Sequence, residues 1–291
     1  MEPVIRRCGA SRCPPTRACR VRTQVLCAVP STLLIPLAAR ASGGQRFPWL
    51  DCDDQHAADL LHCLNADDTP RLRDGPTVVN VLWRTQLLKE AGRAFFREHP
   101  TSLGVNLGCG LSSHFQWLDT GHNRWVDADL PEVTELREEL LPDGRRRKNA
   151  MIDLSEGDWW DRLGLPEHPE GAPVFILCEG VLMYLQPHQV EQVLRTFGER
   201  APAGSRLVLD TLSYLAVGRA RLHASVGPTG AEFHWGIRSP GELTAPHGRL
   251  ELHSLRSVTE CYGLAGVWSE AWWQPWIGSP LYGMATLGVD N

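Results

Sequence analysis

Short apolar runs alternate with longer amphipathic segments through the middle of the chain. An unbroken apolar run of about five residues predicts a strand that is covered on both faces. Strand and helix alternating at least four times is typical of an α/β fold, in which helices cover both faces of a mostly parallel sheet. The predicted strands are 103–107, 124–128, 148–152, 173–178 and 205–210, and the predicted helices between them include 132–141 and 187–199.

The segments on either side of this repeat predict further elements. Three stretches before the first strand, 32–41, 54–64 and 78–99, have apolar faces with helical spacing. We expect residues 31–100 to form an N-terminal helical cap over a binding domain at 101–291. Within that domain, residues 212–248 predict an insertion on the acceptor side. Strands are expected at 250–255 and 281–289, with a short helix at 258–262 that Gly263 stops.

The first thirty residues differ from the rest in charge. They hold six arginines and one acid, a net +5, so the total of −5 leaves −10 for the other residues. Residues 1–30 also lack apolar periodicity. We therefore expect them to form a disordered Arg/Cys-rich extension. The run from Val25 to Ala39 also mimics a secretory signal, but Pro30 and Pro36 interrupt it and it lies far from the start. We therefore expect a cytoplasmic protein.

The composition, net charge and cysteine spacing of the whole chain argue against several classes of function. A hydrophobic content of 43% with 22% charged residues is ordinary for a globular protein. No apolar run is long and clean enough to span a bilayer, and an acidic chain has no overall attraction to nucleic acid. The nine cysteines include no CxxC pair and no zinc-like spacing with histidine, so no metal site is expected.

The stretch from Leu103 to Pro131 carries the strongest chemical signal. Its first strand ends in a glycine turn that contains Gly108 and Gly110, a helix-length segment follows, and the next strand ends in acid at Asp127 and Asp129. Glycine lets a ligand approach the backbone, and an acid about 20 residues later can bind ribose hydroxyls. The stretch therefore predicts a nucleoside site.

Ser113 helps to decide which nucleoside cofactor the site would bind. A dinucleotide site prefers a third glycine at that position, so a nicotinamide cofactor is the weaker alternative. S-adenosylmethionine has no phosphate and needs an acid for the ribose, a polar contact for the adenine, and partners for its amine and carboxylate. Parallel strands present their carboxyl ends at one edge, where such groups would gather. The candidates there are Gly108, Gly110, Asp129, Asp153, Glu179 and Asp210.

A series of motifs occurs along the chain in this order: TLLIPLAARA, NVLWRTQLLKEA, VNLGCGLSSHF, WVDADLPEV, DLS, CEGVLMYL, FHWGI and VTECYGL. Together they resemble the leucine carboxyl methyltransferase family of class I S-adenosylmethionine-dependent enzymes. The more specific likeness is to bacterial polyketide O-methyltransferases of the tetracenomycin type, over about residues 31–290. The resemblance implies a seven-stranded sheet with an antiparallel last strand and an N-terminal helical cap.

The same resemblance implies roles for the cofactor-binding residues. Arg84 would pair with the methionine carboxylate, although spacing alone reads it as a surface arginine. Glu179 would meet the methionine amine, and Gly108 and Gly110 would lie against the cofactor. Asp129 would accept the ribose hydroxyls.

Further roles carry open alternatives. Asp127 is the rival of Asp129, and either acid could be a solvated loop residue. Asp153 and Leu154 would border the adenine, but Asp153 could instead cap a helix before Ser155. Many relatives carry Asp-Thr-Arg after the glycine turn, where this chain has Ser112-Ser113-His114, so contacts from that loop stay open.

The acceptor side suggests which group receives the methyl. Tyr184 would face the active site or pack in the core, and His234 is the favoured of three candidate bases, with His114 and His188. A carboxylate is ionised at neutral pH and needs no base, whereas a phenol would be helped by one. Each of these histidines fits a structural or surface position better than a catalytic one, so none is a compelling base. We therefore expect a small-molecule carboxylate acceptor, which the resemblance also implies. A phenol acceptor and a non-catalytic binding protein are the alternatives. An apolar pocket or the core could hold Phe233, Trp235, Trp272, Trp273 and Trp276.

Overall fold

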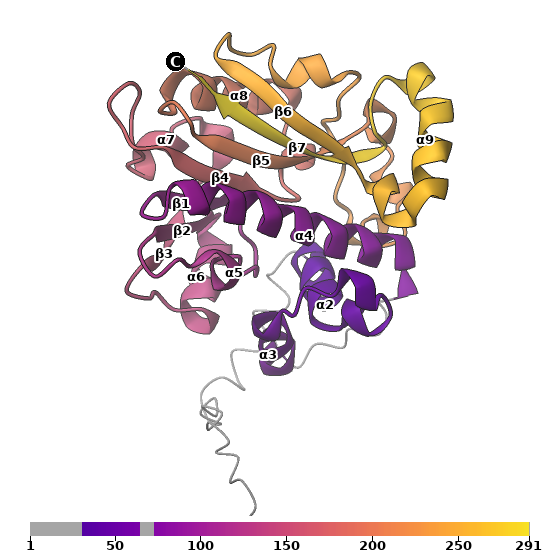
Figure 1. The fold of residues 1–291 in the computed structure, drawn as a ribbon. Coiled ribbons are helices and arrows are strands. Elements are labelled where there is room, and N and C mark those ends of the chain that lie inside the picture. Colours follow the sequence, from indigo (N-terminus) through magenta and orange to yellow (C-terminus); the bar gives the residue numbers. More distant parts are fainter. Residues whose placement is uncertain (1–30, 65–72, 291) are drawn as a thin grey trace, which may run out of the picture.

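A seven-stranded sheet forms the centre of the molecule (Figure 1). The computed structural model describes residues 31–64 and 73–290, so the extension expected at 1–30 lies outside the described residues. The strand order is β3-β2-β1-β4-β5-β7-β6, with β7 antiparallel to both of its neighbours and the other pairs parallel. The predicted α/β fold is confirmed. The strands are β1 Leu103–Leu107, β2 Arg124–Asp129, β3 Arg147–Met151, β4 Val174–Cys178, β5 Arg206–Leu212, β6 Leu250–Ser257 and β7 Tyr282–Val289.

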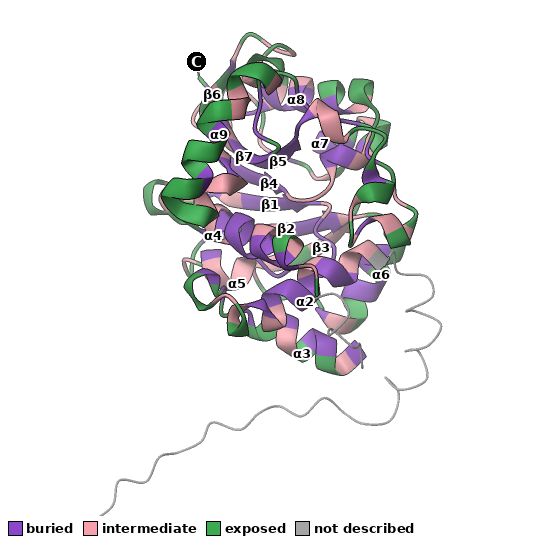
Figure 2. Ribbon diagram, turned by 90° about the vertical axis from the view of Figure 1, so that its right-hand side faces the viewer, coloured by how far each residue is buried: buried purple, intermediate pink, exposed green. Residues whose placement is uncertain are grey.

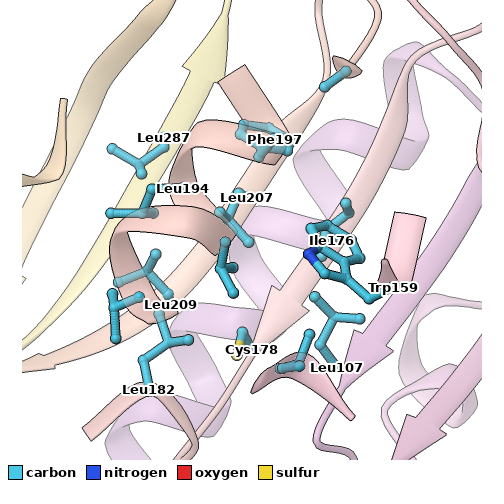
Figure 3. Close-up of a cluster of buried hydrophobic side chains, with 14 of the residues drawn as sticks. Leu107, Trp159, Ile176, Cys178, Leu182, Leu194, Phe197, Leu207, Leu209 and Leu287 are labelled. Atoms are coloured by element: carbon cyan, nitrogen blue, oxygen red, sulfur yellow. The ribbon is translucent and has the colours of Figure 1, made fainter. Parts of the chain in front are cut away.

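The central strands are apolar throughout because both of their faces are covered. In β4, Val174, Ile176 and Cys178 join one buried cluster, while Phe175 and Leu177 join another. Side chains alternate across a sheet, so an unbroken apolar run is what a doubly covered strand requires. Figure 3 shows the first cluster, with Ile176 and Cys178 near side chains from β1, β5 and β7.

Helices supply the two covers. α7 (Trp159–Arg162) and α8 (Pro187–Arg200) place Trp159 and Phe197 in the first cluster. On the other face runs α4 (Gly75–Glu98), which contributes Phe95 and Phe96 to the second cluster (Figures 1 and 2). The Asp74 side chain caps α4 by accepting from the Thr77 N–H, which satisfies one of the unpaired donors of its first turn.

A smaller layer of helices lies beside the glycine turn. α2 (Leu34–Ser42) packs on α3 (Gln55–Leu64), and both share a buried cluster with Leu111 after the turn and with Leu136 of α6 (Pro131–Leu140). These N-terminal helices therefore contact the carboxyl edge of β1 and β2.

Three sequence expectations differ from the structure. The segment after the glycine turn forms only α5 (Phe115–Leu118), because the residues before it make a loop. Gly263 does not end the helical region: η11 (Val258–Tyr262) continues into α9 (Gly263–Ile277). The 212–248 segment is built from short 3₁₀ turns, and the helix that the sequence predicts near 240–245 is the 3₁₀ turn η10 (Pro240–Leu243). No helix in the described part of the chain combines the length and apolar character needed to cross a bilayer.

Gly104 tests how tightly side chains pack on the face of the sheet that α4 covers. A methyl group at this position would lie 2.2 Å from Cε3 of Trp125, whose ring is buried. Because rigid aromatic packing leaves no room for it, Gly104→Ala should lower the free energy of unfolding by about 1–3 kcal/mol. Urea denaturation measures this loss. Gly144→Ala is the matched control, since its methyl group meets only the Arg147 carbonyl at 3.9 Å; equal losses in the two variants would contradict the packing.

Candidate active site

A cavity of about 160 Å³ opens at the carboxyl ends of β1, β4 and β5. Its walls come from segments far apart in the sequence: α2, α4, the glycine turn, the residues after β4, the 212–248 segment and the start of β7. Five of the predicted site residues line it together: Arg84, Gly108, Gly110, Glu179 and Tyr184.

The glycine turn has a backbone that other residues rarely adopt. Gly108 and Gly110 have φ values of +64° and +51°, and a methyl group on Gly108 would lie 2.2 Å from Val181 Cγ2. The Gly110 N–H donates to Asp129 Oδ2 over 2.6 Å, and the Leu130 N–H donates to Oδ1 over 2.8 Å. Both glycines are therefore needed for this conformation, and Asp129 is fixed directly beside the turn.

The two acids of β2 have different environments. Asp127 is fully buried and accepts from Arg137 Nη2 over 2.6 Å and from Trp125 Nε1 over 2.8 Å. Arg137 also donates to the Gly110 and Ser112 carbonyls, so this ion pair holds the turn in place. Asp129 is only partly buried, and that burial raises its pKa. Asp127 therefore has a structural role. Asp129 lies beside the glycine turn but is not among the residues that line the cavity, so its role with the ribose stays a prediction.

Arg84 connects α4 to the ends of two strands. Its Nε donates to Glu179 Oε1 over 2.6 Å and its Nη1 donates to the Tyr282 hydroxyl over 2.9 Å. The same hydroxyl donates to Asp210 Oδ2 over 2.5 Å, and Asp210 Oδ1 accepts from the Gly180 N–H. Burial raises the pKa of Asp210. The result is a continuous buried chain of charged and polar groups below the cavity.

Glu179 is surrounded by positive and donor groups. Besides Arg84, His114 Nε2 lies 2.8 Å from its Oε2 and Arg40 Nη1 lies 3.8 Å from its Oε1. Burial raises the pKa of Glu179, but the two arginines and the histidine outweigh it and hold the pKa well below its ordinary value. Both carboxylate oxygens are thus already paired with side chains of the chain itself, so the role expected for Glu179 with the methionine amine stays a prediction.

Within the described part of the chain, two amide oxygens at the cavity have no hydrogen-bond partner. Asn80 Oδ1 and Asn106 Oδ1 are buried and unpaired, and both residues line the cavity. An unpaired buried acceptor is costly, so these atoms are suited to a ligand with N–H donors. Together with the glycine turn and Asp129, they fit a molecule that combines an amine with a nucleoside.

The acceptor side of the cavity is aromatic. The ring centroids of Tyr184 and Phe233 are 5.7 Å apart, and burial raises the pKa of Tyr184 to about 12. His223 packs edge-on against Phe233 and lines the same cavity. Its Nδ1 accepts from the Ser225 and Val226 N–H groups, each over 3.3 Å, and burial lowers its pKa. The neutral ring therefore carries its hydrogen on Nε2.

Other predicted site residues lie away from the cavity. Asp153 Oδ1 accepts from the Ser155 N–H and caps a short helix, which is the structural alternative, and Leu154 is buried in the core. Their adenine role stays a prediction. His234 is exposed and is not among the residues that line the cavity, and its catalytic role stays a prediction.

The aromatic residues for which pocket and core were both open divide between several environments. Of the five, Phe233 alone lines the cavity, while Trp235 joins the first buried cluster. Trp272 and Trp276 are 84% and 88% exposed on α9.

Sequence reasoning missed several residues of the site. Arg40 stands in the TLLIPLAARA motif, but nothing in that motif marks it as a site residue, and Tyr282 and His223 stand in none of the quoted motifs. His223 has one weak signal, since Ser225 follows at the spacing of a side-chain turn. Asn80 and Asn106 look like ordinary polar positions in a helix and a strand.

The profile of the family described as leucine carboxyl methyltransferase matches residues 35–198. The tetracenomycin polyketide synthesis O-methyltransferase TcmP of Streptomyces glaucescens is 31% identical over 75% of this chain and 78% of its own length. An S-adenosyl-L-methionine-dependent methyltransferase of Gibberella zeae is 25% identical over 81% of this chain and 84% of its own length.

The fold is similar to the solved structure of a candidate methyltransferase from Thermobifida fusca. The TM-score is 0.57 at 16% identity, over 92% of this chain and 98% of that one. The glycine turn, the acid at the end of β2 and the sequence matches all indicate the same family. The chain therefore belongs to the leucine carboxyl methyltransferase family of S-adenosylmethionine-dependent enzymes.

Proposed function

We propose that this methyltransferase converts a carboxylate of a small, partly apolar molecule into its methyl ester. The observation that supports this proposal concerns the titratable side chains on the aromatic side of the cavity: among the described residues they can donate hydrogen bonds, but none is a free base. Glu179 is paired on both oxygens, His223 accepts at Nδ1, and the pKa of Tyr184 is about 12. A carboxylate acceptor is already ionised and needs only donors to hold it.

The cofactor would lie along the glycine turn. Bound S-adenosylmethionine supplies a methyl group on a positively charged sulfur. Asp129 would bind the ribose, and the unpaired oxygens of Asn80 and Asn106 would accept from the amine. Arg84 would donate to the methionine carboxylate from Nη2, for which no hydrogen bond is seen among the described residues.

The acceptor would lie between the cofactor site and the aromatic wall. Tyr184 and His223 Nε2 would each donate a hydrogen bond to the acceptor carboxylate and orient one oxygen toward the methyl group. Leu212, Val226 and Phe233 would cover the apolar body and exclude water. That TcmP is named for polyketide synthesis supports a polyketide-like acid as the acceptor.

An acceptor screen tests the proposal. Matched pairs of aromatic acids and phenols, incubated with radiolabelled methyl donor, should give base-labile methyl esters from the acids and little product from the phenols. Because no enzyme base must ionise, turnover of the acid should vary little between about pH 6 and pH 9. Faster transfer to phenols, with a rate that rises through a single pKa, would overturn the carboxylate assignment.

Asp129→Asn tests the cofactor site. The amide retains an oxygen for the Gly110 N–H. It loses the acceptor for the Leu130 N–H, which is at an exposed residue, and the charge that would bind two ribose hydroxyls. We expect the affinity for S-adenosylhomocysteine, measured by calorimetry, to fall at least about tenfold, which is 1.4 kcal/mol, with the melting temperature nearly unchanged.

Asp127→Asn is the contrasting variant. Removing the buried partner of Arg137 should cost about 3–5 kcal/mol of stability. Unchanged affinity in Asp129→Asn would remove that residue from the ribose role.

His223→Gln and His223→Ala test the donor at the acceptor wall. The glutamine amide can still donate a hydrogen bond, so it should retain more activity than alanine. We expect alanine to raise KM for the acid about tenfold while the affinity for S-adenosylhomocysteine stays constant. His188→Ala is the control, because His188 is exposed at the start of α8. An unchanged acceptor KM in His223→Ala would exclude this contact.

A further inference from the structure

α9 carries a row of large apolar side chains that nothing in the described part of the chain covers. Leu264, Trp268, Trp272 and Trp276 are 79%, 75%, 84% and 88% exposed. They recur every four residues and therefore lie along one slowly winding stripe about 18 Å long. Figure 1 shows α9 at the edge of the molecule, and Figure 2 shows it as largely exposed.

The opposite edge of α9 fixes it to the protein. A methyl group on Gly266 would lie 2.0 Å from the Thr259 carbonyl oxygen, so α9 and η11 are in direct backbone contact. Glu270, one turn later, is buried and accepts a hydrogen bond from the Thr259 hydroxyl. Since this edge is anchored, the tryptophan stripe points away from the protein.

The size of the stripe matches what a stable dimer buries. An indole buries about 150–250 Å², so three that are at least three-quarters exposed offer about 400–600 Å². Leu264, Val267 and Tyr262, each about half exposed or more, extend this area. The total approaches the roughly 800 Å² that each partner contributes to a standard interface, and it exceeds what most monomers leave uncovered.

The charge of α9 and the symmetry of its apolar row indicate which kind of partner covers it. Residues 258–281 contain no lysine or arginine, so α9 lacks the basic groups that bring an interfacial helix to an anionic membrane. The row is also symmetric about Glu270. When two α9 helices lie antiparallel with a twofold axis at that point, Trp268 faces the other copy's Trp272, and Leu264 faces its Trp276.

We propose that the protein is a homodimer in which the α9 helices of two copies pack antiparallel through this stripe. The interface is isologous, because the same surface is used by both copies. This interface lies on the face of α9 that carries Trp268 and Trp272, and it is separate from the cavity. Dimerisation therefore does not depend on the identity of the acceptor.

Sedimentation velocity and light scattering on the full chain test the proposal. The wild type should have about twice its monomer mass of 32.4 kDa at micromolar concentration. Trp268→Gln and Trp272→Gln should each raise the dissociation constant at least about thirtyfold, and the double variant should be monomeric. Because both side chains are exposed, the melting temperature extrapolated to the monomer should not fall.

Trp49→Gln is the matched control, since Trp49 is 69% exposed on a different segment and should leave the dimer intact. A monomeric wild type would overturn the proposal, whether or not it binds vesicles of phosphatidylcholine and phosphatidylserine. A dimer that persists in the double variant would overturn it equally. Cofactor affinity, measured on the same samples, separates this result from any failure of the proposed methyl transfer.

Discussion

The site depends on one buried cation, the guanidinium of Arg84. It comes from α4 and meets Glu179 after β4, while Tyr282 at the start of β7 links it to Asp210 of β5. Burying so many charged groups would be strongly unfavourable without mutual pairing. Here each carboxylate accepts at least two hydrogen bonds, so the carboxyl edge of the sheet can hold charges beneath a cavity with largely apolar walls.

The need to pair buried charges also explains why the two acids of β2 have different environments. Asp127 is used entirely within the protein, because its ion pair with Arg137 fixes the carbonyls of the glycine turn. Asp129, two residues later, lies on the same face of the strand but at its end, where it reaches the turn from outside. A strand that ends in two acids can therefore stabilise a ligand site with one and present the other to the ligand.

Most of the fold could be predicted from the sequence, because its signals are local. The apolar run at 103–107 is β1 to the residue, and the runs that predict β4 and β5 differ by one or two residues at their ends. Prolines marked the starts of α6 and α8. Gly263 was misread because a glycine can begin a helix as well as end one. The aromatic run after it looked like pocket lining, since the sequence does not say which way a helix faces.

The site was only partly predictable because its remaining members come together through tertiary structure. Arg84 and Tyr282 are 198 positions apart, and no local pattern relates them. His223 owes its role to two backbone N–H groups that fix its hydrogen on Nε2, whereas His234, which stands in a recognisable motif, faces outward. A motif identifies which segment is near the acceptor, but burial and hydrogen bonding decide which side chain of that segment can act. The carboxylate acceptor is therefore proposed from the donors of Tyr184 and His223 rather than from the motif that contains His234.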